Sequence, residues 1–212
     1  MMPLLARFRE VYEQQTLPLG RVCTRLGLSA DMLTYLSLAF SVVAGYLIAR
    51  GWFLWGVAAI LLVGLADMLD GATARASGTA SEYGTVLDHV TDRYAEFFLL
   101  GGVLMSGAAA PGWVLFALFG MVMASYVRAR AESTKKLISC NVGFAGRQEK
   151  LALLVAGLVL QPFFPGLALL EWAVIAIGVA SHITAAQRLR YARQMLVGSR
   201  DRRDLSQGRG VI

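Results

Sequence analysis

The chain contains few charged residues. Asp, Glu, Lys and Arg together make up 16% of its 212 residues, whereas hydrophobic residues make up 57%. A soluble domain carries about 25% charged residues. The shortage of charge excludes an ordinary soluble domain and predicts an all-α integral membrane protein. A chain of this length has room for roughly six crossings of about 20 residues each.

Cysteines are also few, since the chain has only Cys23 and Cys140. Two cysteines exclude a disulfide framework, and we expect both to be unpaired thiols near the cytoplasmic face. We expect no cleavable signal peptide, because residues 1–25 mix Arg and Glu with apolar residues and the first long apolar run starts near Met32. The net charge of +6 is typical of membrane orientation and contact with anionic lipid headgroups, so we expect no nucleic-acid partner.

The apolar runs predict the order of the elements. Leu4, Leu5, Phe8 and Val11 recur at helical spacing with charged residues between them, which favours an amphipathic helix on the membrane surface. The expected domains are this interfacial helix with its linker at 1–30, a six-span domain at 31–197 and a basic, flexible tail at 198–212. The six transmembrane helices are expected at about 31–49, 52–74, 82–105, 111–130, 150–160 and 167–186.

Basic residues lie almost entirely on one side of this predicted topology. Six spans put both termini on the same side, together with the polar loop at 132–150 and nearly all of the Arg and Lys residues. Among the basic residues only Arg50 falls on the opposite side. Because basic residues favour the cytoplasmic side, we expect a multi-pass protein of the cell membrane with cytoplasmic termini.

Four aspartates interrupt the apolar pattern within 26 residues: Asp67, Asp70, Asp88 and Asp92. An ionised carboxylate near a bilayer is costly unless it is paired, hydrated or bound to a cation. Helical spacing puts Asp67 and Asp70 on one face of one helix, and Asp88 and Asp92 on one face of the next. The connection between these helices is short, so we expect the four carboxylates to converge just inside the cytoplasmic interface.

Converging carboxylates suit hard divalent cations. One or two Mg²⁺ or Mn²⁺ ions with arginines nearby favour phosphoryl transfer, in which the metal neutralises a diphosphate and a free carboxylate takes the proton of an attacking hydroxyl. Small residues beside the aspartates, such as Gly71, Gly78 and Gly84, leave space for a ligand. Two other interpretations stay open from the residues alone: helix-end carboxylates paired with arginine, and the ion site of a cation-coupled membrane transporter.

The aspartates are part of a longer pattern, Asp67-x2-Asp70-Gly71-x2-Ala74-Arg75-x8-Gly84-x3-Asp88-x3-Asp92. At each defined position it resembles the signature of the CDP-alcohol phosphotransferase family of membrane enzymes. The resemblance implies six transmembrane helices, an amphipathic N-terminal helix and a homodimer. It also implies that Asp67, Asp70 and Asp88 bind the metal, and that Asp92 acts as the general base and as a further metal ligand. The residues that we expect around the CDP-lipid are Gly71, Ala74, Arg75, Gly78, Gly84 and Thr34.

A further resemblance concerns the acceptor of the transferred group. Ser125 with Arg128 and Arg130, Arg147 before the fifth span and Arg188 after the sixth are similar to the family branch that makes phosphatidylinositol phosphate or archaetidylinositol phosphate. This branch implies that Ser125, Arg147 and Arg188 bind the phosphate of inositol phosphate, and a phosphorylated acceptor does need its own cationic site. The donor is then CDP-diacylglycerol or CDP-archaeol, and CMP is released. Glycerol 3-phosphate or another alcohol is the alternative acceptor.

Overall fold

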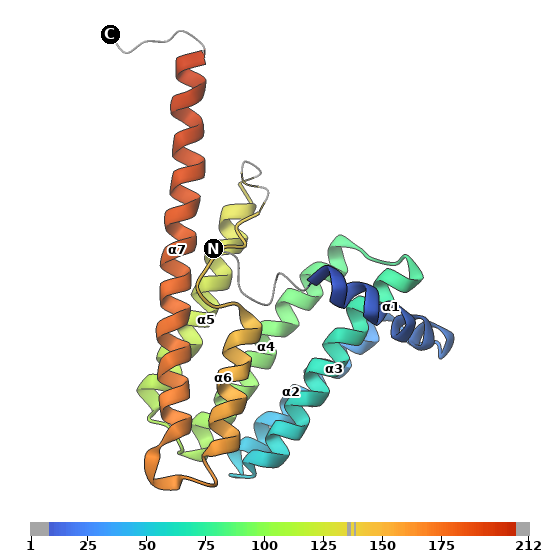
Figure 1. Cartoon of the computed structure of the whole chain (residues 1–212), viewed down its shortest axis with the longest axis vertical. Coiled ribbons are helices and arrows are strands. Elements are labelled where there is room, and N and C mark those ends of the chain that lie inside the picture. The colour runs from blue at the N-terminus through green and yellow to red at the C-terminus, as the bar shows by residue number, and fades with distance from the viewer. Residues whose placement is uncertain (1–8, 135–136, 138, 207–212) are drawn as a thin grey trace.

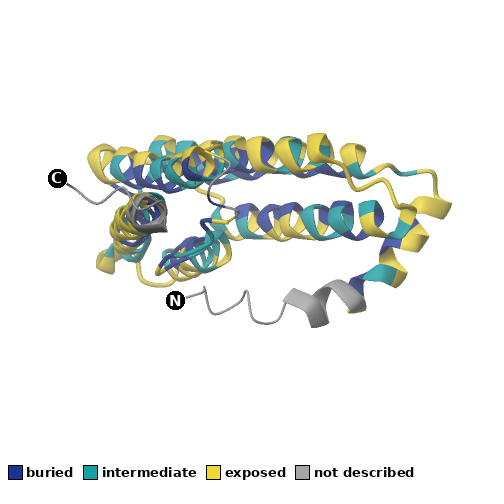
Figure 2. Cartoon of the chain, turned by 90° about the horizontal axis from the view of Figure 1, so that it is seen from above, coloured by how far each residue is buried: buried dark blue, intermediate teal, exposed yellow. Residues whose placement is uncertain are grey.

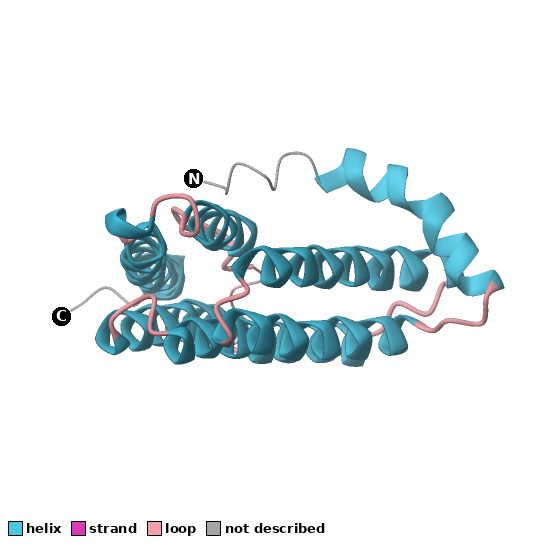
Figure 3. Cartoon of the chain, turned by 90° about the horizontal axis from the view of Figure 1, so that it is seen from below, coloured by secondary structure: helices cyan, strands magenta, loops and turns pink. Residues whose placement is uncertain are grey.

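The computed structural model describes residues 9–134, 137 and 139–206, and within these residues it contains helices and loops but no strand (Figures 1 and 3). This confirms the all-α class. Seven α-helices and one short 3₁₀ turn follow one another in the described chain: α1 (Arg9–Arg25), α2 (Ala30–Ala49), α3 (Phe53–Ser77), α4 (Glu82–Ser106), α5 (Pro111–Glu132), α6 (Arg147–Leu160), η2 (Pro165–Leu167) and α7 (Leu169–Ser206).

Local sequence signals set the ends of the helices that carry the aspartates. The Ser29 hydroxyl caps α2 by accepting a hydrogen bond from the Met32 amide at 3.2 Å. Gly78 ends α3 in the left-handed conformation (φ 69°), which glycine adopts without a steric penalty. Ser81 then caps α4 by accepting from the Gly84 amide at 2.9 Å. The chain therefore reverses within a few residues, and the aspartates of α3 and α4 lie at the same end of the bundle.

Helices α2, α3 and α4 pack together, and α7 packs on α5 and α6, as the arrangement in Figure 1 shows. Close approach between helices depends on glycine. A Cβ at Gly102 of α4 would lie 2.4 Å from the carbonyl oxygen of Gly45 in α2, and a Cβ at Gly157 of α6 would lie 2.8 Å from Ala173 of α7. Small residues at helix crossings allow the backbones to approach closely, which drives helix association in a bilayer through van der Waals contact.

One apolar cluster joins α2, α3, α4, α5, α6 and α7. Seen from above, the buried residues lie on the sides of the helices that face one another (Figure 2). Large apolar side chains such as Leu61 and Phe119 remain exposed on the outside, as a lipid-facing surface requires. The fully buried members of the cluster include Ile48, Ile60, Leu100, Val114, Leu158 and Ile177.

The expectation of six transmembrane helices is confirmed in part. Among the described residues, α2, α3, α5 and the segment Pro165–Val197 are long and apolar enough to cross a membrane. Helix α4 has 25 residues but carries two aspartates, two glutamates and an arginine in its sequence. Helix α6 has 14 residues, fewer than the about 20 that a spanning helix usually needs. These two helices do not qualify by length and composition alone.

The ends of the chain differ in detail from the expected elements. The expected amphipathic helix corresponds to α1, while Leu4, Leu5 and Phe8 lie outside the described residues. At the other end, α7 continues 20 residues beyond the expected end of the last span at Ala186 and reaches Ser206 (Figure 1). The segment from Ala186 to Ser206 has no proline, and its single glycine, Gly198, is accommodated within α7, so no strong helix breaker interrupts it. Residues 207–212 lie outside the described chain, and the expected domain boundaries remain predictions.

Candidate active site

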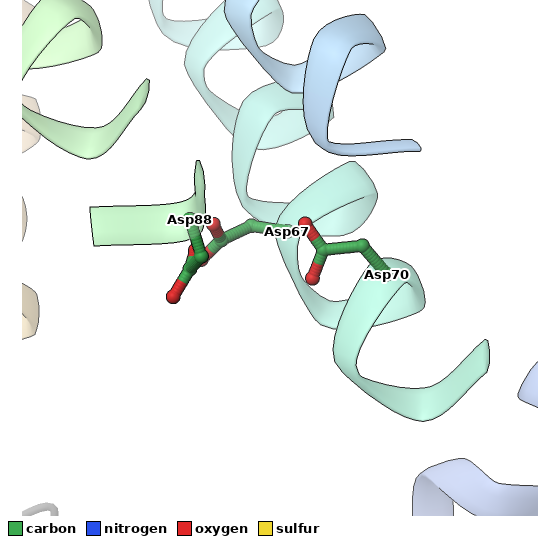
Figure 4. A group of neighbouring side chains, drawn as sticks. All are labelled: Asp67, Asp70 and Asp88. Atoms are coloured by element: carbon green, nitrogen blue, oxygen red, sulfur yellow. The ribbon is translucent and has the colours of Figure 1, made fainter. Parts of the chain in front are cut away.

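Three of the four aspartates form one group (Figure 4). Asp67 and Asp70 project from α3 and Asp88 projects from α4, and one carboxylate oxygen of each lies within 4.8 Å of the others. Asp70 is only 7% exposed, while Asp67 and Asp88 are half-buried. Oxygen ligands at this separation suit a hard divalent cation. The donor set therefore fits the metal that the sequence pattern led us to expect.

Thr34 fixes the orientation of one of these carboxylates. Its hydroxyl lies on α2, is buried, and is 2.8 Å from Oδ2 of Asp70 and 3.1 Å from the carbonyl oxygen of Ala30. A serine or threonine hydroxyl has a single proton, so it donates to one of these two acceptors at a time. The structure thus places Thr34, an expected CDP-lipid residue, directly against an expected metal ligand.

Arg147 bridges the aspartate group and the expected base. It is the first residue of α6, and its Nη1 lies 2.9 Å from Oδ2 of Asp67 while its Nη2 lies 2.7 Å from Oδ1 of Asp92. The planar guanidinium suits such a two-pronged contact, which a lysine does not reproduce. The cationic site expected for the acceptor and the carboxylates expected for the metal are therefore in direct contact.

Asp92 is buried on α4 and is surrounded by positive charge. Besides Arg147, Nη2 of Arg93 lies 4.0 Å from its Oδ2. Arg93 also forms a short ion pair with Glu96, one turn further along α4. The sequence showed that Arg93 and Glu96 are embedded charges but did not identify their partners, and the structure shows that they pair with each other.

Apart from Thr34 on α2, the residues expected around the CDP moiety lie in the last turns of α3, at its C-cap and in the first turn of α4. The guanidinium of Arg75 lies over Gly71, where a Cβ would be 3.2 Å from its Nη1. Nη2 of Arg75 also reaches the hydroxyl of Thr16 on α1, at 3.4 Å. Ala74 is half-buried, Gly78 is the exposed cap of α3, and Gly84 is half-buried beside the capping serine of α4. No pattern in the sequence pointed to Thr16.

Arg188 and Ser125 lie further along the bundle, where α5 and α7 meet. Arg188 is 8% exposed, and its guanidinium donates to two backbone carbonyls: Nε to Val142 at 2.9 Å and Nη1 to Ala124 at 2.6 Å. Ala124 precedes Ser125, which is half-buried. Arg188 thus connects α7 to α5 and to the loop before Arg147, and its expected contact with an acceptor phosphate remains a prediction.

Lys150 is a buried charge that sequence reasoning did not assign to the site. It is 5% exposed and follows Arg147 by three residues on α6. Lys150, Arg147 and Glu96 line the same small cavity. A lysine spaced i, i+3 from a site arginine on one helix face was the signal that could have identified it.

Comparison with known proteins agrees with the sequence pattern. Residues 28–184 match the family model described as CDP-alcohol phosphatidyltransferase. The chain is 36% identical over 194 residues to the phosphatidylinositol phosphate synthase of Mycobacteroides abscessus, covering 87% of this chain and 86% of the relative. It is 33% identical over 199 residues to the archaetidylinositol phosphate synthase of Methanothermobacter thermautotrophicus, covering 91% and 96% of the two chains.

Solved structures give the same result. The phosphatidylinositol phosphate synthase of Mycobacterium tuberculosis with CDP-DAG bound superposes with a TM-score of 0.75 at 32% identity, covering 84% of this chain and 93% of that one. A second structure of the same enzyme, in complex with manganese and citrate, gives a TM-score of 0.76 at 32% identity, with coverages of 84% and 88%.

Proposed function

The chain belongs to the CDP-alcohol phosphatidyltransferase family and is a phosphotransferase, and on that premise we propose that its acceptor is inositol phosphate. The lipid phosphate group moves from CDP-diacylglycerol or CDP-archaeol to a hydroxyl of inositol phosphate, and CMP is released. The relatives named as phosphatidylinositol phosphate and archaetidylinositol phosphate synthases support this acceptor. Family membership also sets aside the transporter that the aspartates alone left open.

The observation that carries the proposal is the position of Arg147. Its guanidinium contacts Asp67, an expected metal ligand, and Asp92, the expected base. A phosphate held by this guanidinium brings the rest of the acceptor close to Asp92 and to the metal-binding carboxylates. A phosphorylated acceptor therefore uses this arginine, whereas an uncharged alcohol gains nothing from it.

The chain's own residues supply the proton transfer and the orientation. Asp67, Asp70 and Asp88 would hold the Mg²⁺ or Mn²⁺, which when bound would neutralise the diphosphate of the donor. Asp92 takes the proton of the acceptor hydroxyl while that oxygen forms a bond to the lipid-linked phosphorus. The bond between this phosphorus and the CMP oxygen breaks, and CMP leaves with the bonding electron pair.

Arg147 links the two substrates' sites in this mechanism. In the ligand-free chain it neutralises Asp67 and Asp92, which would otherwise be buried or half-buried anions. A metal bound by Asp67 would displace the guanidinium from that carboxylate, and when the guanidinium turns to the acceptor phosphate, Asp92 becomes available to the hydroxyl proton. Ser125 and Arg188 complete the acceptor site in this proposal, and Gly71, Ala74, Arg75, Gly78 and Gly84 surround the CDP moiety.

The proposed topology has α4 and α6 as the two spans that complete a set of six. The charged residues of α4 face the bundle interior, where Asp92 and Glu96 are buried, while Val86, Val90 and Phe97 of the same helix are exposed. Both termini and the active site are then cytoplasmic by the distribution of basic residues. A homodimer is proposed on the family resemblance alone.

CMP release from a panel of acceptors tests the function. Purified protein is incubated with a CDP-lipid, Mn²⁺ or Mg²⁺, and inositol phosphate, glycerol 3-phosphate or free inositol. We expect metal-dependent release with inositol phosphate and none with free inositol. Release with glycerol 3-phosphate in place of inositol phosphate would refute the acceptor, and release that persists in excess chelator would refute the metal.

A further inference from the structure

Behind Arg147, between α4 and α6, lies a second group of charges that the proposed mechanism does not use. Glu96 is 7% exposed and Lys150 is 5% exposed. Both side chains line a cavity of about 30 Å³ together with Arg147, and the remaining walls are apolar residues such as Val63, Met121 and Ile177. Charged groups in such surroundings are costly unless they are compensated.

The two oxygens of Glu96 have different surroundings. Oε2 accepts from Arg93, whereas Oε1 is buried without a hydrogen-bond partner among the described residues. The cavity is large enough for about two water molecules. It therefore has room for water-mediated hydrogen bonds that join Oε1 of Glu96 to the Lys150 ammonium and to the Arg147 guanidinium.

Arg147 has carboxylates on both sides, and on one side Asp70 and Asp88 lie within 4.8 Å of Asp67. Three carboxylates (Asp67, Asp92 and Glu96) lie among three cations (Arg93, Arg147 and Lys150). Arg147 lies between the aspartates on one side and Glu96 on the other, so it is attracted in both directions. Lys150, by compensating Glu96, weakens the backward attraction and leaves Arg147 directed at Asp67 and Asp92.

We propose that Lys150 and Glu96 are positioning residues that set, through their mutual compensation across the cavity, how strongly Arg147 is held against Asp67 and Asp92. Neither touches the acceptor, because both are buried behind Arg147. The inference rests on the proposed function for its acceptor readout, but its metal readout does not require an acceptor.

The proposal predicts opposite changes in acceptor binding and in Mn²⁺ binding. In Lys150→Met, Glu96 keeps Arg93 as an ion-pair partner but loses the lysine, so its attraction for Arg147 increases and draws the guanidinium backward. The acceptor phosphate then loses its contact with Arg147, so the KM for the acceptor rises about tenfold. Asp67 is no longer paired with Arg147, so Mn²⁺ binds about threefold more tightly. In Glu96→Gln, the two remaining cations push Arg147 toward the aspartates, and Mn²⁺ binding weakens about threefold.

The double variant Glu96→Gln/Lys150→Met removes both members of the pair. Removing two opposite buried charges together is better tolerated than removing one, and Arg93, which loses Glu96, keeps Asp92 at 4.0 Å, so this protein is expected to fold even if a single variant does not. Its acceptor KM and its Mn²⁺ affinity are expected within about twofold of the unmodified chain. Gln148→Met, an exposed change on the same helix, is the matched control and is expected to change neither value.

The experiment measures Mn²⁺ affinity by titration of the purified chain without substrates, and KM for both substrates by CMP release. An equal increase in the KM values for acceptor and CDP-lipid in Lys150→Met would overturn the proposal. A double variant that is as impaired as Lys150→Met would also overturn it, because that result is expected if Lys150 itself binds the acceptor. If the unmodified chain uses glycerol 3-phosphate instead of inositol phosphate, the proposed acceptor is wrong. The opposite changes in metal affinity and in the KM of glycerol 3-phosphate would then still support the positioning role.

Discussion

Replacing Arg147 by alanine removes one cation that contacts two carboxylates. The side chain reaches Asp67 at 2.9 Å and Asp92 at 2.7 Å, and it is the only described cation within 4 Å of Asp67. Its loss has two effects in the proposed mechanism. The acceptor phosphate loses a bidentate contact, and Asp67 is no longer paired, so that it becomes fully available to a metal ion.

The magnitudes follow from the contacts. A hydrogen bond to a charged group contributes about 1.5–3 kcal/mol, and each 1.4 kcal/mol is tenfold. We therefore expect the KM for inositol phosphate to rise about 10- to 150-fold in Arg147→Ala. The Arg147–Asp67 pair is half-buried, so its removal is expected to tighten Mn²⁺ binding by about 1 kcal/mol, or roughly fivefold.

CMP release measures this prediction when one substrate is varied while the other and the metal are saturating. The KM for the CDP-lipid is expected to change by less than about twofold, because the residues expected around the CDP moiety are on α2, α3 and α4, whereas Arg147 is on α6. Arg50→Ala is the matched control. Arg50 is an exposed arginine at the opposite end of α2, where it is expected to face the other side of the membrane.

Equal increases in the two KM values would refute the reasoning, since they would mean that Arg147 only holds the fold together. An unchanged acceptor KM combined with tighter Mn²⁺ binding would also refute it, because Arg147 would then neutralise the aspartates without binding the acceptor. Arg147→Lys separates charge from geometry and is expected to recover only part of the loss, because an ammonium does not reproduce the bidentate contact.

Three further predictions concern the rest of the site and the packing of α1 on α3. Asp92→Asn is expected to abolish CMP release while changing CDP-lipid affinity by less than about threefold in a direct binding assay, and retained turnover would exclude Asp92 as the base. Asp88→Asn removes one of the three carboxylates expected to hold the metal, so Mn²⁺ affinity should fall at least about tenfold by titration, and unchanged affinity would place the metal elsewhere. In Gly20→Ala the new Cβ would lie 2.2 Å from the Ala72 carbonyl oxygen, forcing α1 away from α3 and lowering stability by about 1–3 kcal/mol. Thermal unfolding compares it with Gly64→Ala, which meets no atom within 4 Å and should be neutral or stabilising.

The sequence predicted the features that depend on local spacing. Asp67 and Asp70 share a helix face, and the short turn after Gly78 brings Asp88 beside them, as the spacing indicated. The all-helical class followed from long apolar runs without strand periodicity. The predicted count of six spans is confirmed for four helices only, because hydropathy averages over a helix. Helix α4 carries charged residues that turn inward, so its composition is not that of a typical span, and helix α6 is shorter than a typical span.

Contacts between distant segments could not be predicted in the same way. Arg147 and Asp67 are 80 residues apart, and no periodicity in one helix specifies which side chain of another it meets. The same holds for Arg188, whose contacts with the backbone carbonyls of Val142 and Ala124 depend on how the loop before α6 folds onto α7. A resemblance named these arginines as candidates, but only the packing shows that one of them contacts the aspartates.

The contact of Arg147 with both Asp67 and Asp92 has a thermodynamic consequence. If metal ion and acceptor phosphate both displace this guanidinium from Asp67, the binding of either makes the binding of the other more favourable, and linkage requires the two effects to be equal. In the proposed mechanism the CDP-lipid brings its own diphosphate to the metal and does not use Arg147. Metal and CDP-lipid therefore bind without the acceptor, and only the Arg147–Asp67 ion pair is broken. The acceptor then binds to a guanidinium that is already released from Asp67. This favours an order in which the donor and the metal bind first, so that Asp92 is freed for proton transfer only when an acceptor phosphate is present.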